Sequence, residues 1–327
     1  MTRKLLVTEL WALGDLVLAT PFLRAAAASG EFQISLLAKP PALELQPRLW
    51  PGVQVIPFVF PWTAFRGKYV LHRWPWSQLW KLARELRAHR FDIGATARRD
   101  ARDHVVLRLS GARQRIGFPH LGSGLFLTQS LDLPPADAHR YENWRGLGRA
   151  LGLELPPMER AIPPVTGRRD ILLHSGAAQP ARIWPLERFD FLVKQLRGNH
   201  YQVRVICDAQ QRPWWTAHGE PAITPVNLAE FFTLLDTAGL FVGNDSGPGH
   251  LAGILGIPTF SLFGNQFPGR FAPLGPSPGW VEGGPCPFKP CYDSCRFPQP
   301  NCLLDIGQEQ AWLRLRDFAA RHLPPQV

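Results

Sequence analysis

The chain has 327 residues, of which 45% are hydrophobic and 19% charged, and this excludes a disordered protein and allows two ordinary domains. Lys and Arg number 36 against 26 Asp and Glu, so the formal net charge is +10 and indicates an anionic partner. The N-terminus has neither a signal-peptide core nor a cleavage site, and no apolar run approaches about 18 residues. We therefore expect a soluble, cytoplasmic protein that is at most peripheral to a membrane.

The first half of the chain alternates short apolar runs with helical patterns. In chain order, the expected strands and helices are 4–8 (strand), 15–28 (helix), 34–38 and 53–59 (strands), 77–89 (helix) and 91–96 (strand). Pro21 is expected to kink or divide the first helix. Residues 57–75 form a long loop rich in basic and aromatic side chains.

A Pro-rich segment, 150–169, is interpreted as an interdomain linker, and a second alternation follows it. Its expected elements are 170–174 (strand), 186–198 (helix), 202–207 (strand), 228–238 (helix), 239–243 (strand), 249–255 (helix), 259–263 (strand) and 308–322 (helix). This pattern predicts an α/β protein with two Rossmann-like parallel-sheet domains, 1–160 and 161–327, facing one another across a cleft. The final helix could pack back on the first domain.

Three β-to-α junctions carry polar and Gly-rich residues where an open α/β sheet binds ligands. The first is Gly14-Asp15, where Gly14 permits a tight turn and is assigned to binding the donor. Asp15 is interpreted either as a helix N-cap or as a carboxylate that acts as a general base at the mouth of a cleft.

The second junction runs from His174 through Ser175 and Gly176 to Arg182. Its small residues let backbone N–H groups approach an anion, and Arg182 adds a fixed positive charge for a diphosphate. The structural alternative is that Trp184-Pro185 wedges the start of the next helix.

The third junction has polar residues, glycine and a histidine between a strand and a helix. These residues are Asn244, Asp245, Ser246, Gly247 and His250. They could form a well-capped loop, since Asn, Asp and Ser favour turns. They could also bind a nucleotide or a sugar through backbone donors, a hydroxyl and an imidazole.

Together the three junctions resemble the lipopolysaccharide heptosyltransferases, glycosyltransferase family 9. The resemblance rests on GDLVLATPFLRA at 14–25, LLHSGAAQPARIWPLERF at 172–189 and NDSGPGHLAGILGIPTFSLFG at 244–264. Their order and spacing match, so the resemblance covers nearly the whole chain. It implies a GT-B fold with the acceptor on the N-terminal domain and the nucleotide-sugar donor on the C-terminal one.

The resemblance also implies an inverting, metal-independent transfer from ADP-heptose to an inner-core saccharide on lipid A, at the inner leaflet of the cytoplasmic membrane of a Gram-negative bacterium. The family's catalytic Asp corresponds to Asp15. Its basic residue at the donor phosphates corresponds to Arg182, where many members have Lys. The donor-binding Asp-Ser/Thr-Gly and His fall on Asp245, Ser246, Gly247 and His250. No nucleic-acid partner is implied.

Two observations from the residues agree with this reading. The chain has no Asp-x-Asp, the usual carboxylate pair for a metal that bridges diphosphate oxygens, so no cofactor is expected in catalysis. The basic balance suits an anionic acceptor. The acceptor surface is assigned, without motif support, to the loop 62–76, and in particular to Arg66, Lys68, His72 and Arg73.

Four cysteines lie in a Pro-rich segment before the final helix, at Cys286, Cys291, Cys295 and Cys302. Four thiols within reach of one another can close a tetrahedral site for a structural zinc or iron, although this spacing lacks a Cys-x₂-Cys pair. The alternatives are reduced thiols packed in a loop or a single disulfide.

Two other classes of function stay open. A nicotinamide-dependent oxidoreductase would need Gly-x-Gly-x-x-Gly after the first strand, but the turn at 8–15 has a single glycine. A nucleic-acid-binding protein would suit the basic balance and the cluster at 98–102, although basic residues are spread along the chain.

Overall fold

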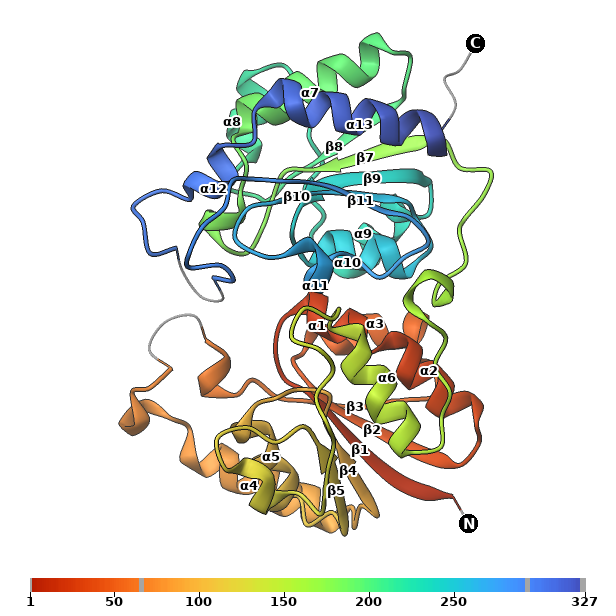
Figure 1. Cartoon of the computed structure of the whole chain (residues 1–327), viewed down its shortest axis with the longest axis vertical. Helices are drawn as coiled ribbons and strands as arrows, with labels where there is room; N and C mark the ends of the chain where they lie inside the picture. Colours follow the sequence, from red (N-terminus) through yellow and green to blue (C-terminus); the bar gives the residue numbers. More distant parts are fainter. Residues whose placement is uncertain (1, 65–67, 292–294, 324–327) are drawn as a thin grey trace. The chain divides into compact units, whose positions relative to one another are not determined.

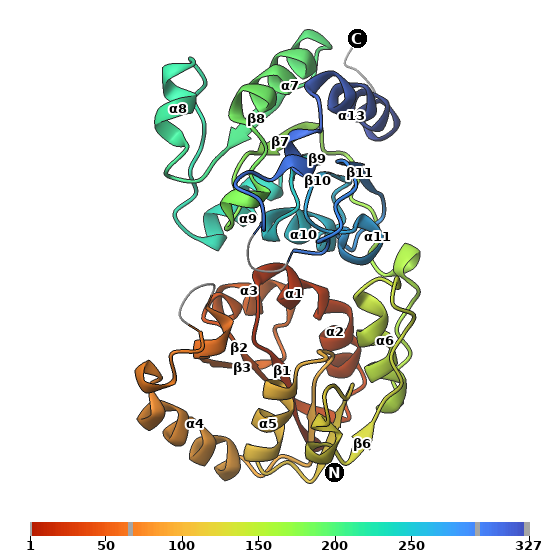
Figure 2. The same cartoon turned by 60° about the vertical axis from the view of Figure 1, so that its left-hand side comes forward.

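A computed structural model describes residues 2–64, 68–291 and 295–323. The chain divides into two compact units, Met1–Pro156 and Pro157–Val327 (Figures 1 and 2). Both are parallel sheets with helices on their faces, as the alternating sequence pattern predicts. Within the described part of the chain, no helix has the length and apolar character needed to span a bilayer.

The N-terminal unit is built on a six-stranded sheet with the order β3-β2-β1-β4-β5-β6, and every pair is parallel. The strands are β1 (Arg3–Glu9), β2 (Phe32–Ala38), β3 (Gln54–Pro57), β4 (Ile93–Ala95), β5 (Gln114–Gly117) and β6 (Gln129–Ser130). After β3 the chain crosses to the other side of β1 and forms β4. The polypeptide therefore changes direction across the sheet between β1 and β4, and such a switch point is where open α/β sheets bind ligands.

Helices cover both faces of this sheet (Figure 1). They are α1 (Leu13–Leu18), α2 (Thr20–Ala28), α3 (Pro41–Leu49), α4 (Trp76–Ala88), α5 (Ala101–Leu109) and α6 (Tyr141–Ala150). The single helix expected at 15–28 is two helices. Pro21 lies in the first turn of α2, where a backbone N–H would have no helical partner, so proline costs no hydrogen bond there. The break between the two helices falls at Ala19.

The C-terminal unit has a five-stranded parallel sheet with the order β11-β10-β9-β7-β8. The strands are β7 (Asp170–His174), β8 (Val203–Ile206), β9 (Ala238–Asn244), β10 (Thr259–Phe263) and β11 (Pro278–Glu282). Here the switch point lies between β7 and β9, because β8 pairs on one side of β7 and β9 on the other. The loops that follow β7 and β9 therefore meet at one edge of the sheet.

The C-terminal sheet is also covered on both faces, with α7 and α13 on one side and α9 and α10 on the other (Figure 1). The helices of this unit are α7 (Leu186–Gly198), α8 (Arg212–Ala217), α9 (Leu228–Leu235), α10 (Gly247–Ile254), α11 (Pro268–Phe271), α12 (Asn301–Leu304) and α13 (Gln308–His322). Helix α13 packs on α7 and on strands β9 to β11 and belongs to this unit. Its apolar side chains, including Trp312 and Phe318, join the buried core.

Candidate functional site

Asp15 lies inside a helix and does not cap it. Helix α1 begins at Leu13, its N-cap is Ala12, and no side chain caps it. The interpretation of Asp15 as a cap is therefore wrong. Its carboxylate is about a quarter exposed at the carboxyl end of β1, beside the switch point of the N-terminal sheet.

Two arginines hold the Asp15 carboxylate, and neither belongs to the three sequence motifs. Arg98 Nη1 lies 3.0 Å from Asp15 Oδ1, and Arg140 Nη2 lies 3.7 Å from the same oxygen. Arg98 follows β4, and its guanidinium carbon lies 4.7 Å from the centre of the Trp11 ring. Arg140 is the N-cap residue of α6. Loops from β1 and β4 therefore meet at Asp15, and its carboxylate has a fixed orientation.

A second carboxyl group, Glu9, is buried beneath this cluster. It is the last residue of β1, is 2% exposed, and its Oε1 lies 3.8 Å from Arg98 Nη1. Burial raises the pKa of Glu9 to about 7, although Arg98 opposes the shift. Lys39, at the end of the neighbouring strand, interacts electrostatically with both Asp15 and Glu9. The site thus combines Asp15 and Glu9 with three cationic side chains, and Asp100 and Asp103 also interact electrostatically with Arg98.

The raised pKa of Glu9 gives the stability of the protein a defined pH dependence. The folded state keeps a proton that the unfolded chain releases above about pH 4.5, so the Glu9 contribution to stability falls as the pH rises from about 4.5 to about 7. In Glu9→Gln the side chain stays neutral, so this decline should disappear and the variant should be the more stable protein above about pH 7. Urea unfolding at about pH 5 and at about pH 8 measures the difference.

Glu31→Gln is the control for this experiment, because Glu31 is a surface residue of the same unit with a side chain that is 60% exposed. Its stability should follow the wild-type curve at both pH values. Parallel pH curves for the wild type and Glu9→Gln would show that Glu9 titrates normally in the folded protein.

In the C-terminal unit, Asn244 joins the two loops at the switch point. Its side-chain amide donates to the Ser175 carbonyl oxygen at 2.9 Å and accepts from the Trp184 N–H at 3.0 Å. The residue has no exposed surface. We therefore assign Asn244, predicted as a donor-binding residue, to positioning the loop that follows β7.

Arg182 carries the positive charge at this edge of the sheet. It ends a short 3₁₀ turn, Pro180–Arg182, and its Nη1 lies 3.3 Å from Asp245 Oδ2. Asp245 is 4% exposed at its side chain, whereas the Arg182 side chain is 24% exposed. The buried carboxylate thus holds a guanidinium that can still reach a ligand.

Helix α10 begins beside this ion pair. Its N-cap is Ser246, but the Ser246 hydroxyl makes no cap bond and has no hydrogen-bond partner among the described residues. Gly247 is the first helical residue, and His250 is buried in the first turn. Backbone N–H groups at a helix start, a hydroxyl that does not cap the helix and a nearby guanidinium together suit an anionic ligand.

The remaining residues of the loop after β7 are largely internal. Ser175 bonds to Gln211 and Trp215 and is fully buried. A side chain at position 176 would collide with the Asp208 carboxylate in its present position, so glycine allows this close approach. Burial lowers the pKa of His174, and the imidazole is therefore neutral near pH 7.

The predicted acceptor residues are only partly described. Arg66 lies outside the described residues. Lys68 is half-buried, with its Nζ 5.5 Å from the centre of the Tyr69 ring, and His72 and Arg73 are exposed in the 3₁₀ turn Leu71–Arg73. Their role in binding the acceptor stays a prediction.

The structure describes all four clustered cysteines, and a structural zinc or iron at them stays a prediction. All four are free thiols, and the described residues contain no group of three or more Cys, His, Asp or Glu side chains placed to hold a metal ion. Cys291 Sγ lies 3.4 Å from the Phe288 carbonyl oxygen, and burial raises the pKa of the Cys291 and Cys302 thiols. This arrangement fits packed, protonated thiols. The only support for a structural zinc or iron is the spacing of the cysteines in the sequence.

Comparison with known proteins agrees with this geometry. The profile of glycosyltransferase family 9 (heptosyltransferase) matches residues 79–298. A comparison with curated proteins gave no match. The family match sets aside both the oxidoreductase and the nucleic-acid-binding alternatives.

Solved structures of similar architecture cover almost the whole chain. A family 9 glycosyltransferase from Veillonella parvula has a TM-score of 0.74 at 19% identity over 98% of both chains. The Escherichia coli ADP-heptose lipopolysaccharide heptosyltransferase II has a TM-score of 0.70 at 19% identity and covers 98% of this chain and 99% of its own. The E. coli heptosyltransferase WaaC, solved with ADP, has a TM-score of 0.71 at 17% identity and covers 97% of this chain and 100% of its own.

At these identities the likeness shows the fold, which is the predicted GT-B class with two parallel-sheet α/β domains. The family profile covers 220 of 327 residues, which is more than half of the chain. The chain therefore belongs to glycosyltransferase family 9, the heptosyltransferases.

Proposed function

We propose that this glycosyltransferase moves a heptose from ADP-heptose to an anionic inner-core saccharide of lipopolysaccharide, by an inverting mechanism that needs no metal. One observation carries the proposal. Each sheet has a charged site at its switch point: Asp15 between two arginines in the N-terminal unit, and Arg182 beside the start of α10 in the C-terminal unit.

The site around Asp15 is assigned to the acceptor. Inverting transfer requires a base that takes the proton of the acceptor hydroxyl as it attacks the anomeric carbon, and Asp15 has this role in the proposal. Arg98, Arg140 and Lys39 surround it, and their positive charge suits carboxylate or phosphate groups on the acceptor. The family resemblance and these cationic side chains support the same choice of acceptor.

The site around Arg182 is assigned to the donor. Negative charge develops on the departing ADP as the glycosidic bond breaks, and donors that face the diphosphate stabilise it. The Arg182 guanidinium, the N–H groups at the start of α10 and the Ser246 hydroxyl are the candidates. The E. coli relative WaaC has been solved with ADP and with ADP-2-deoxy-2-fluoro heptose, which makes ADP-heptose the donor to test first.

No metal takes part in the proposed mechanism. The sequence lacks an Asp-x-Asp pair, and Arg182 with the start of α10 supplies the positive charge that a metal would otherwise give. The protein is proposed to act at the inner leaflet of the cytoplasmic membrane of a Gram-negative bacterium, where a lipid-linked acceptor would be found.

The test is a panel of donors and acceptors with product analysis. Purified protein is incubated with ADP-heptose, ADP-glucose or UDP-glucose and a deacylated inner-core saccharide, with and without EDTA. We expect ADP release and heptosyl product with ADP-heptose alone, an unchanged rate in EDTA, and an anomeric configuration opposite to that of the donor. Mass spectrometry and proton NMR report these results.

Each part of the proposal can fail separately in this panel. Turnover with another nucleotide sugar would replace the donor, and retention of configuration would exclude single displacement by an Asp15-activated hydroxyl. Loss of activity in EDTA that Mg²⁺ or Mn²⁺ restores would overturn the metal-independent mechanism.

A further inference from the structure

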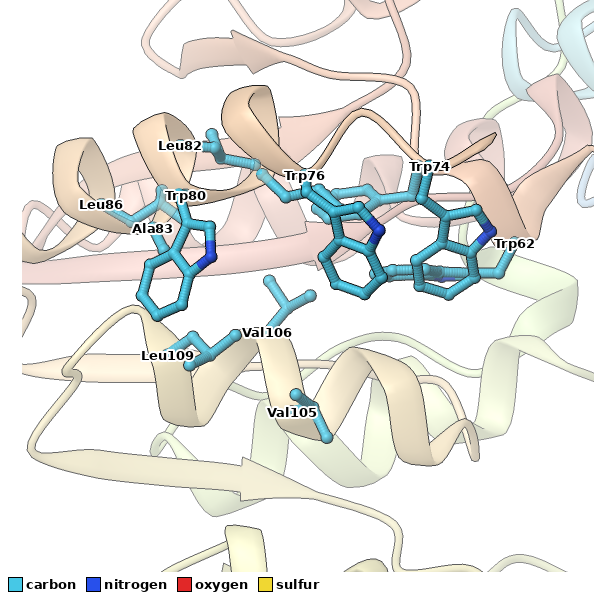
Figure 3. A pocket seen from close by; sticks show the side chains of 12 residues that line it. Trp62, Trp74, Trp76, Trp80, Leu82, Ala83, Leu86, Val105, Val106 and Leu109 are labelled. Atoms are coloured by element: carbon cyan, nitrogen blue, oxygen red, sulfur yellow. The ribbon is translucent and has the colours of Figure 1, made fainter. Parts of the chain in front are cut away.

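The N-terminal unit contains an apolar pocket that the proposed transfer chemistry does not use. It has a volume of about 240 Å³ and lies between α4 and α5 (Figure 3). Its walls are Phe60, Trp62, Trp74, Trp76, Leu79, Trp80, Leu82, Ala83, Leu86, Val105, Val106 and Leu109. Every one of these side chains is apolar or aromatic.

Contacts between aromatic rings hold one wall of the pocket in place. Ring centres are 4.5 Å apart for Phe60 and Trp62, 5.5 Å for Trp62 and Trp74, and 5.4 Å for Trp74 and Trp76. The indole N–H groups of Trp74 and Trp76 donate to the carbonyl oxygens of Lys68 and Leu71. Rings tied in this way present an ordered apolar surface, on which the indole N–H groups of Trp74 and Trp76 are satisfied and that of Trp62 has no hydrogen-bond partner among the described residues.

The pocket opens on an exposed apolar surface. Trp76 is 49% exposed, Trp80 is 64% exposed, and Leu109 on the opposite wall is 39% exposed. Figure 3 shows Trp76 and Trp80 pointing from α4 toward Val105 and Leu109 of α5. Large apolar side chains left exposed around a pocket mark a binding surface for an apolar ligand.

Basic side chains accompany this surface. The exposed ones on α4, on α5 and in the turn before α4 are Arg73, Lys81, Arg84, Arg87 and Arg108. Arg87 links the two helices, because its Nε donates to the Leu109 carbonyl oxygen at 2.9 Å. Glu85 is the single acidic residue of α4. The exposed charge on α4, on α5 and in the turn before α4 is therefore mainly positive.

An apolar pocket with a basic rim selects its ligand by chemistry. A nucleotide or a saccharide would leave its polar groups unsatisfied against these walls. A second copy of the chain would bring like charges together at the rim. A hydrocarbon chain attached to an anionic headgroup satisfies both parts, since the chain enters the pocket and the headgroup meets the exposed arginines of α4 and α5. Tryptophans are also the side chains that favour the boundary between water and lipid.

We propose that the pocket between α4 and α5 takes an acyl chain of an anionic membrane lipid and that its basic rim contacts the headgroups, so that the N-terminal unit docks on the bilayer here. This inference deepens the proposed function, on which it rests for a membrane location. It uses none of the residues assigned to donor or catalysis. Trp62, Arg73, Trp74 and Trp76 lie in the loop predicted for the acceptor, but the variants below change other residues, so the two can fail separately.

Vesicle binding of the full-length protein, without donor or acceptor, tests the proposal. We expect flotation with vesicles of phosphatidylcholine and phosphatidylglycerol and little with phosphatidylcholine alone. Trp80→Ser and Leu109→Ser should each weaken binding by roughly tenfold, because each removes a large apolar side chain from the membrane contact. Arg84→Gln should weaken it by about fivefold.

The controls are matched in residue type and exposure but lie in the other unit. Trp280 on β11 is 41% exposed and Leu313 on α13 is 51% exposed, so Trp280→Ser and Leu313→Ser should bind vesicles as the wild type does. Lipids brominated on their acyl chains should quench the fluorescence of the wild type more than that of Trp80→Ser.

Three outcomes would overturn the proposal: no binding of the wild type to anionic vesicles, equal binding to neutral ones, or unchanged binding of both pocket variants. Transfer to a soluble, deacylated acceptor separates this failure from that of the proposed function. Trp80→Ser should keep the wild-type rate in that assay. A protein that binds vesicles but transfers no heptose would leave the lipid pocket standing and overturn the transferase proposal.

Discussion

Asp15→Asn is expected to fold normally, bind ADP as the wild type does and lose at least two orders of magnitude in kcat, the usual range when a general base is removed. The amide keeps an oxygen that can accept from Arg98, which lies 3.0 Å from the carboxylate in the wild type. It cannot take the proton of the acceptor hydroxyl. The loss should therefore appear in turnover, while the donor site in the other unit stays intact.

Three measurements check this result: the initial rate with a soluble acceptor, calorimetric titration with ADP and a thermal melt. Asp137→Asn is the control, because it removes an exposed carboxylate from the same unit. A near-normal kcat in Asp15→Asn would leave Asp15 as a partner of Arg98 and Arg140 alone, and the base would have to be sought elsewhere in the site.

Arg182→Ala should weaken ADP binding and also slow transfer. One guanidinium serves the diphosphate of the bound donor and the charge that develops on departing ADP, and loss of a charged hydrogen bond costs roughly 10- to 100-fold in each. The substitution also leaves the buried Asp245 carboxylate, 3.3 Å from Arg182, without this cation. Arg182→Lys keeps the charge but not the planar fork, so its effects should lie between those of the wild type and Arg182→Ala.

The readouts are the Kd for ADP and the rate of transfer at saturating donor. Lys194→Ala is the control, since this lysine is 70% exposed on α7 and touches neither loop of the switch point. Unchanged ADP affinity in Arg182→Ala would remove Arg182 from the phosphate site.

Sequence periodicity predicted the C-terminal sheet better than the edges of the N-terminal one. The strands at 170–174 and 259–263 and the helices at 186–198 and 308–322 have the predicted bounds. The two helices are long and the two strands are almost fully buried, so tertiary packing and local pattern favour the same structure. By contrast β5, with the sequence QRIG, and the two-residue β6 are short and largely polar, so they show no clear periodicity.

The residues around Asp15 show the limit of motif reading. Arg98 and Arg140 lie 83 and 125 positions after Asp15, and only the strand order β2-β1-β4 brings the β4 loop beside it. The basic run at 98–102 indicated a charged site, but its charge alone was as compatible with nucleic-acid binding as with an ion pair to Asp15. Glu9 gave no signal, because its burial and raised pKa arise from the packing around it.

A ribosome makes β7, the first strand of the C-terminal sheet, long before it makes the helix that covers one face of this sheet. Strand β7 ends at His174, whereas α13 begins at Gln308 and supplies Trp312, Leu315 and Phe318 to the core. About 130 residues must therefore emerge while that apolar face has only α7 to cover it. The N-terminal unit has a comparable delay, because β1 ends at Glu9 and α6, whose Trp144 packs against Phe22 of α2, begins only at Tyr141. The nascent chain should accordingly depend on chaperone protection during synthesis of each half.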